Sequence, residues 1–179
     1  MASSEGRLAI IGPGHAFGRE LVDLAHQRNL QPVVVSRIPS RYVPVRANIT
    51  TIPCDLARHG GVQDLADSMR QHGVDSVLFL ARYSNIWPGG CTESVAAQVS
   101  YHAQAGHFAV TALADNLPKL REKMTIVTSD LGLAPDPKKP VESIEAGAMI
   151  ATAGALHLGL TVIKGRVVPS IATRVAASV

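Results

Sequence analysis

The sequence predicts a doubly wound α/β protein, with a mostly parallel sheet of about six strands and helices on both faces. Short apolar segments of strand length alternate with segments whose apolar residues recur at helical spacing. Some of the short segments, such as VDSVLFLA at residues 74–81, are apolar almost throughout, as in strands buried on both faces of a parallel sheet. No linker, low-complexity tract or repeat divides the 179 residues, which predicts a single domain over residues 1–179.

The first half of the chain begins with a strand, a glycine-containing turn and a helix. RLAII at residues 7–11 is a short apolar strand, and the helix after it ends at Asn29. The β-branched run PVVVSR predicts the next strand, and Gly73 stands where a helix C-cap is expected. The further elements expected in this half are strands at 32–37 and 49–54, a helix at 62–73 and a strand at 74–81.

The second half repeats the alternation. A long helix is expected at about 92–116, a strand at 124–129, a helix at 141–157 and a strand at 160–165. A proline-rich loop, APDPKKP, precedes the second of these helices. Strands that alternate with helices imply right-handed crossovers, and hence a sheet covered on both faces.

Composition and charge exclude several classes of function. The net charge of +3 comes from scattered Lys and Arg with few aromatic residues, which argues against nucleic-acid binding. No apolar stretch approaches the ~20 residues of a membrane span. The N-terminus has no pattern of a secretory signal, so a cytoplasmic location is expected. Cys54 and Cys91 lack metal-ligand spacing and are interpreted as free thiols, with no metal site.

The turn after the first strand, within IIGPGHAFGRE, is a candidate phosphate site. A Rossmann fold places a pyrophosphate there, because free N–H groups and the positive end of the helix face an anion. The glycines are Gly12, Gly14 and Gly18, whereas the common GxGxxG pattern would require glycine at Phe17. His15 lies inside the loop, where it is either a phosphate donor or an ordinary exposed histidine.

The run LAIIGPGHAFGRELVDLAHQRNLQPVVVSR resembles the opening of the short-chain dehydrogenase/reductase superfamily. As in that superfamily, the first and last glycines of the loop, Gly12 and Gly18, are six residues apart, whereas His15 and Ala16 depart from its pattern. CDL, VDSVLFLAR and TIVTSDLG resemble later landmarks of the family in the same order. The chain is also similar to the atypical branch that contains small flavin- and biliverdin-reductase-like proteins.

The resemblance implies an NADP site. Arg37 stands at the end of the second strand, where a guanidinium can grip a 2′-phosphate with help from Ser36. Asp55 matches the family residue that meets the adenine edge, and Ala81 and Arg82 match the backbone beside the ribose. The implied cofactor-binding residues are Gly12, Gly14, His15, Phe17, Gly18, Ser36, Arg37, Asp55, Leu56, Ala81 and Arg82.

The catalytic pair of the family, a Tyr with a Lys four residues later, has no counterpart in the sequence. The segment ESIEAGAMIATAGALHL, where the pair is expected, contains neither residue type. The candidates to replace it are Tyr83 as proton donor, Ser129, and Asp130 as general base, because all three follow strands at the carboxyl edge of the sheet. The alternative for Ser129 and Asp130 is ordinary turn chemistry.

Three functions remain open on these residues. The first is a small NADP-binding protein of the short-chain type that reduces a small organic molecule, in a biosynthetic pathway. The second is a cofactor-independent cyclase, isomerase or lyase on the same scaffold, and the third is a non-catalytic NADP sensor. The usual substrate-binding region is absent, which favours a homo-oligomer in which a second subunit supplies a wall of the site.

Overall fold

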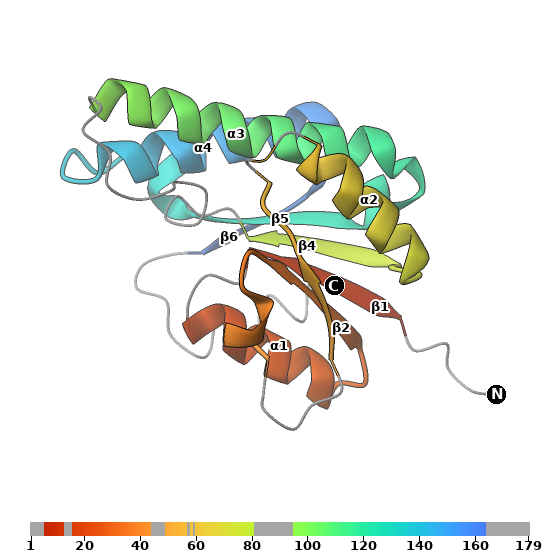
Figure 1. Ribbon diagram of the computed structural model, residues 1–179. Helices are drawn as coiled ribbons and strands as arrows, with labels where there is room; N and C mark the ends of the chain where they lie inside the picture. Colours follow the sequence, from red (N-terminus) through yellow and green to blue (C-terminus); the bar gives the residue numbers. More distant parts are fainter. Residues whose placement is uncertain are drawn as a thin grey trace.

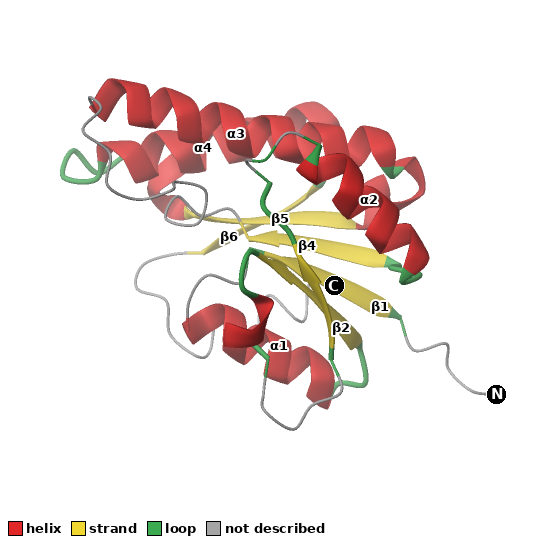
Figure 2. Ribbon diagram, viewed as in Figure 1, coloured by secondary structure: helices red, strands yellow, loops and turns green. Residues whose placement is uncertain are grey.

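A computed structural model describes residues 6–12, 16–43, 49–56, 58, 60–80 and 95–163, without the side chains of residues 16, 17, 95–105 and 141. Its strands form one six-stranded sheet between two layers of helices (Figures 1 and 2). The elements follow in the order β1 (Arg7–Ile11), α1 (Ala16–Gln27), β2 (Gln31–Ser36), η1 (Pro39–Arg41), β3 (Thr50–Pro53), α2 (Gly61–Gln71), β4 (Ser76–Leu80), α3 (Val95–Asn116), η3 (Pro118–Lys123), β5 (Met124–Ser129), η4 (Asp130–Gly132), α4 (Pro140–Leu156) and β6 (Gly159–Ile163).

The six strands are all parallel and lie in the order β3-β2-β1-β4-β5-β6. The chain therefore builds outward from β1 to β3, returns to pair β4 with the other side of β1, and builds outward again to β6. This confirms the doubly wound α/β fold, with a described sheet that is wholly rather than mostly parallel. The direction of winding reverses between β1 and β4, which is where open sheets of this type bind ligands.

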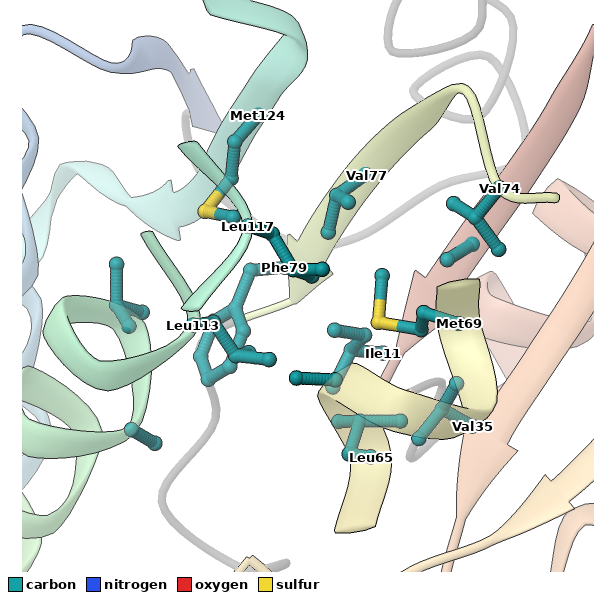
Figure 3. Packing of buried hydrophobic residues seen from close by; sticks show 14 of the residues in the cluster. Ile11, Val35, Leu65, Met69, Val74, Val77, Phe79, Leu113, Leu117 and Met124 are labelled. Atoms are coloured by element: carbon teal, nitrogen blue, oxygen red, sulfur yellow. The ribbon is translucent and has the colours of Figure 1, made fainter. Parts of the chain in front are cut away.

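The helices α2, α3 and α4 cover one face of the sheet and α1 covers the other (Figures 1 and 2). Alternate residues of β1 serve the two layers: Ala9 and Ile11 join the core under α2, α3 and α4, while Leu8 and Ile10 pack toward α1. Figure 3 shows the larger cluster, in which Phe79 of β4 lies among side chains from several elements. Burial on both faces explains why the strands read as nearly continuous apolar runs.

Several strand ends differ from the sequence prediction by one or two residues, and two of the differences have a clear local reason. The second strand ends at Ser36 rather than residue 37, because the Ser36 hydroxyl accepts a hydrogen bond from the Ile38 N–H (3.0 Å) and turns the chain. The fourth strand begins at Ser76 rather than residue 74. Val74 still belongs to the turn that leaves α2, since its N–H donates to the Met69 carbonyl (3.0 Å).

The longest described helices, α3 and α4, lie side by side on the same face of the sheet (Figure 1). His107 of α3 bonds to Thr152 of α4, with 2.9 Å between Nδ1 and Oγ1. Gly106 allows a close approach, because a Cβ there would lie 3.0 Å from the Met149 sulfur. Among the described helices, none combines the length and the apolar character that crossing a membrane requires.

Candidate functional site

The candidate site is the carboxyl edge of the sheet around β1 and β4. The registers pair Ile11 of β1 with Val35 of β2 on one side and with Phe79 of β4 on the other. The residues that follow these strands therefore emerge at one edge of the sheet. The sequence prediction placed the nucleotide at this edge, and the strand order makes it the point where the winding reverses.

Gly12 closes β1 in a conformation that only glycine adopts without strain. Its φ is +73°, its N–H donates to the Val35 carbonyl (3.0 Å), and a Cβ would lie 3.0 Å from the carbonyl oxygen of Leu80. Two independent constraints thus require glycine where the chain passes from β1 toward α1. The contact with Leu80 could not be read from the sequence, because it depends on β4 being the neighbour of β1.

The helix α1 begins at Ala16, and Gly18 is buried in its first turn. Its N-terminus follows the turn at Gly12, so the first N–H groups of the helix and the positive end of its dipole lie at the candidate site. Gly14 and His15 lie outside the described residues, as does the side chain of Phe17. Their predicted contacts with the cofactor stay predictions.

The end of β2 carries Ser36 and Arg37. Arg37 is exposed, and within the described part of the chain its guanidinium has no hydrogen-bond or ion-pair partner. Ser36 is half-buried: its hydroxyl accepts the Ile38 N–H, and its carbonyl accepts the Cys54 N–H at 2.9 Å. Ser36 therefore shapes the turn that presents Arg37, and no hydrogen bond from its hydroxyl to another described residue is seen.

The turn after β3 carries Asp55, which is exposed, and Leu56, which packs against the larger core cluster. The turn is tight, because a Cβ on Gly61 would lie 2.3 Å from the carbonyl oxygen of Asp55. Gly61 therefore brings the start of α2 against the backbone of Asp55. The structure places Asp55 at the same edge as Arg37, and the half-buried Leu56 packs partly against the core, so its predicted contact with the cofactor stays a prediction.

Cys54, at the start of this turn, is a free and half-buried thiol, as the sequence predicted. Its thiol donates to the Gly61 carbonyl, with 3.4 Å between sulfur and oxygen. Burial, with a smaller contribution from the negative charges of Asp55 and Asp64, raises the pKa of Cys54 to about 11. A thiol with this pKa is a poor nucleophile at neutral pH, so Cys54 is structural here. Cys91 lies outside the described residues.

At pH 7, iodoacetamide is expected to alkylate Cys54 about 100-fold more slowly in the folded protein than in urea, because a pKa raised from 9.0 to about 11 lowers the thiolate fraction by that factor. Peptide mapping by mass spectrometry separates Cys54 from Cys91. Equal alkylation rates in both states would contradict the assignment.

The raised pKa of Cys54 also makes the stability of the folded state depend on pH. Its contribution is fully present below pH 9.0 and is lost as pH rises toward 11.

The end of β5 carries Ser129 and Asp130, both half-buried. Asp130 starts the short turn η4, and its carbonyl accepts the N–H groups of Leu133 and Ala134, each at 2.9 Å. Neighbouring strands are about 4.8 Å apart, so the ends of β1 and β5 are about 10 Å from each other. Ser129 and Asp130 are thus within reach of a ligand that spans the edge from Gly12.

The turn η4 is fixed by direct contact with α4. A Cβ on Gly132 would lie 2.6 Å from the carbonyl carbon of Ala146, 2.6 Å from the nitrogen of Gly147 and 2.7 Å from Cδ1 of Ile150. None of these three α4 residues has a side chain that can transfer a proton. The Ser143 hydroxyl is used at the start of α4, where it donates to the carbonyl of the N-cap residue Lys139 at 2.8 Å and accepts the N–H of Asp136, in the preceding loop, at 3.1 Å.

The third predicted catalytic residue, Tyr83, lies outside the described residues together with Ala81 and Arg82. The structure therefore brings Gly12, Ser36, Arg37 and Asp55 to one edge with Ser129 and Asp130 farther along it. The sequence analysis did not single out Gly132, which positions the turn η4 after β5. Its only signal in the sequence was a glycine three residues after a predicted strand.

No known family model and no curated protein sequence matches this chain. Solved structures do. A carbonyl reductase from Pseudomonas aeruginosa PAO1 aligns with a TM-score of 0.70 and 19% identity over 97% of this chain and 90% of that one. A short-chain dehydrogenase/reductase from Vibrio parahaemolyticus aligns with a TM-score of 0.71 and 14% identity, over 95% and 91% of the two chains.

Other similar structures are longer than this chain. A short-chain dehydrogenase from Streptomyces avermitilis aligns with a TM-score of 0.65 and 15% identity over 90% of this chain, which spans 65% of that protein. Identities this low establish a shared architecture and leave the activity to be argued from the site. This chain has the fold of the short-chain dehydrogenases/reductases.

Proposed function

We propose that this protein binds NADP across the carboxyl edge of β1, β2 and β4 and reduces a small organic molecule. The observation that carries the proposal is the turn at Gly12, where φ is positive and there is no room for a side chain. This turn leads from β1 toward the N-terminus of α1, the positive end of the helix dipole. The exposed guanidinium of Arg37 at the next strand supplies the charge that a 2′-phosphate would pair with. A P. aeruginosa carbonyl reductase of the same fold has been solved with NADP.

The residues fit such a cofactor along the edge. Gly12 and the N-terminus of α1 would hold the pyrophosphate, Arg37 the 2′-phosphate and Asp55 the adenine side. When bound, NADPH supplies a hydride. Ser129 would hydrogen-bond the acceptor, and Asp130 and Tyr83 are the proposed groups that move the proton. A free thiol at Cys54 agrees with a reducing compartment, and we propose a cytoplasmic biosynthetic role.

A second candidate is an NADP-binding protein without catalysis. It is favoured by the surface of α4 that packs on η4, where Ala146, Gly147 and Ile150 offer no acid or base. Asp130→Asn and Ser129→Ala distinguish the two candidates once a substrate is assayed. Loss of turnover with unchanged NADPH binding supports the reductase.

Fluorescence titration tests the cofactor directly. Purified protein is expected to bind NADPH with a Kd in the micromolar range, and Gly12→Ala is expected to weaken binding at least tenfold, about 1.4 kcal/mol, because the added methyl group meets the Leu80 carbonyl and strains a positive φ. Gly6→Ala is the matched control, since a Cβ there meets nothing within 4 Å. Absence of NADPH and NADH binding up to roughly 500 µM would overturn the proposal.

A further inference from the structure

The turn after β2 carries an exposed serine between two arginines. Ser40 lies in the middle of η1, Arg37 is three residues before it and Arg41 directly follows it, and all three are exposed. The sequence over residues 24–54 contains arginines but no Asp or Glu. Within the described part of the chain, neither guanidinium forms a hydrogen bond or an ion pair. The segment therefore presents positive charge on both sides of a hydroxyl group.

The hydroxyl of Ser40 is accessible and is not used by the fold. It forms no hydrogen bond with another described residue, and η1 buries none of its three residues. Ser36, the other serine of this segment, is half-buried, and its hydroxyl accepts the Ile38 N–H at 3.0 Å. A modifying enzyme can thus reach Ser40 without opening the core, whereas Ser36 belongs to the end of β2.

The turn keeps Ser40 close to Arg37. At its end, the Tyr42 N–H donates to the Pro39 carbonyl at 2.9 Å, and the Tyr42 side chain packs partly against the core under α1. Three residues of chain span at most about 11 Å, and the long arginine side chain covers much of that distance. Consecutive residues of a 3-10 helix point about a third of a turn apart, so Arg41 diverges from Ser40. Arg37 is therefore the better placed partner for an anion on Ser40.

We propose that Ser40 is a phosphorylation site for a kinase that selects arginine, and that its phosphate pairs with Arg37 and so competes with the 2′-phosphate of NADPH. The Ser40 Oγ attacks the γ-phosphorus of ATP, and the bond from that phosphorus to the β,γ-bridging oxygen breaks. ADP leaves, and the hydroxyl proton passes to a carboxylate of the kinase. Such a kinase recognises arginine near the acceptor serine through acidic side chains of its own.

The phosphate on Ser40 would occupy the group that NADPH needs. It carries a charge of about −1.5 to −2 at pH 7 and three strong acceptor oxygens, which match the guanidinium of Arg37. NADH has no 2′-phosphate and does not depend on this guanidinium. Phosphorylation would thus release NADPH selectively. This effect rests on the proposed function, whereas the modification and the pairing with Arg37 do not.

Kinase treatment of the full chain tests the modification. The kinase used is one that selects arginine three residues before the serine, and it is supplied with ATP and Mg²⁺. Mass spectrometry of peptides is expected to find phosphate on Ser40 and none on Ser36. Ser40→Ala should abolish this signal, and Arg37→Ala should slow the transfer by about tenfold or more, since it removes a charged contact with the kinase. A folded protein that stays unmodified at Ser40 would overturn the proposal.

A ³¹P NMR titration tests the pairing without the kinase or the cofactor. Phosphoserine is introduced at position 40 through a recoded codon, so that variants can be compared. We expect the second pKa of the phosphate to lie below its usual value of about 6, because Arg37 favours the dianion. Arg37→Ala should raise this pKa toward 6, and Arg41→Ala, which removes the same charge beside Ser40, should raise it less. Equal changes in the two variants, or none in either, would overturn the pairing.

Fluorescence titration of the phosphorylated protein tests the competition. Phosphate on Ser40 is expected to raise the Kd for NADPH about 30-fold and that for NADH less than about 3-fold, and to add little once Arg37→Ala has removed the shared partner. An unchanged Kd for NADPH would overturn the competition. If the unmodified protein binds neither cofactor, the competition falls with the proposed function, and the ³¹P NMR titration still decides whether the phosphate pairs with Arg37.

Discussion

Replacing Gly132 by alanine is expected to lower the free energy of unfolding by about 3 kcal/mol, the upper end of typical overpacking costs. The added methyl group would lie 2.6 Å from two backbone atoms of α4, which belong to the helix ladder and cannot move independently. Relief requires η4 and α4 to separate, which opens the core around Met149 and Ala153. Equilibrium unfolding in urea measures the loss.

Two glycines of α4 provide controls for this prediction. Gly154 is exposed in α4 with nothing within 4 Å of its would-be Cβ, so Gly154→Ala should raise stability by up to about 1 kcal/mol. Gly147 lies across the contact from Gly132, but its Cβ would meet the Gly132 oxygen at an ordinary 3.8 Å, and Gly147→Ala should not destabilise. A similar loss in all three variants would contradict the close-packing argument.

The architecture could be predicted because its signals are local. The apolar runs at residues 7–11 and 124–129 coincide with β1 and β5, and alternation with helical patterns implies a doubly wound sheet. The termini of β2 and β4 could not be placed as well. They depend on single hydrogen bonds, such as that from the Ile38 N–H to Ser36, which leave no periodic pattern in the sequence.

The edge of the sheet at which the candidate residues emerge could be predicted where those residues follow strands. Parallel strands end at one edge, so the position of Arg37 or Asp130 along the sequence already fixes the edge at which it emerges. The contacts of Gly12 with Leu80 and of Gly132 with α4 join distant segments, and they depend on strand order and helix packing. Leu56, also predicted to bind the cofactor, packs partly against the core, and its contact with the cofactor stays a prediction.

The exposure of Phe108 could not be predicted for a different reason. The helix over residues 95–116 has apolar residues around its whole circumference, so periodicity does not identify the side that faces the sheet. Only the packing of Ala109, Val110 and Leu113 into the core leaves Phe108 on the outside.

Replacing Arg37 by alanine is expected to raise the Kd for NADPH by about 30-fold and that for NADH by less than about 3-fold, since a hydrogen bond to a charged group contributes 1.5–3 kcal/mol. Of the two cofactors, only NADPH carries the 2′-phosphate, to which the Arg37 guanidinium would donate two hydrogen bonds. Fluorescence titration with NADPH and with NADH measures the ratio of the two Kd values. The preference for NADPH over NADH should also decrease at high salt, which screens the charge of the 2′-phosphate.

Arg41, at the end of η1, is the matched control for this prediction. It is exposed and carries the same charge a few residues from Arg37, but it follows the turn rather than the strand end. Arg41→Ala removes the same net charge, so any general electrostatic attraction for an anionic cofactor falls equally in both variants. A loss specific to Arg37 and to NADPH identifies a direct contact with the 2′-phosphate. Equal losses for both cofactors, or equal losses in both variants, would show that Arg37 contributes only to the overall field.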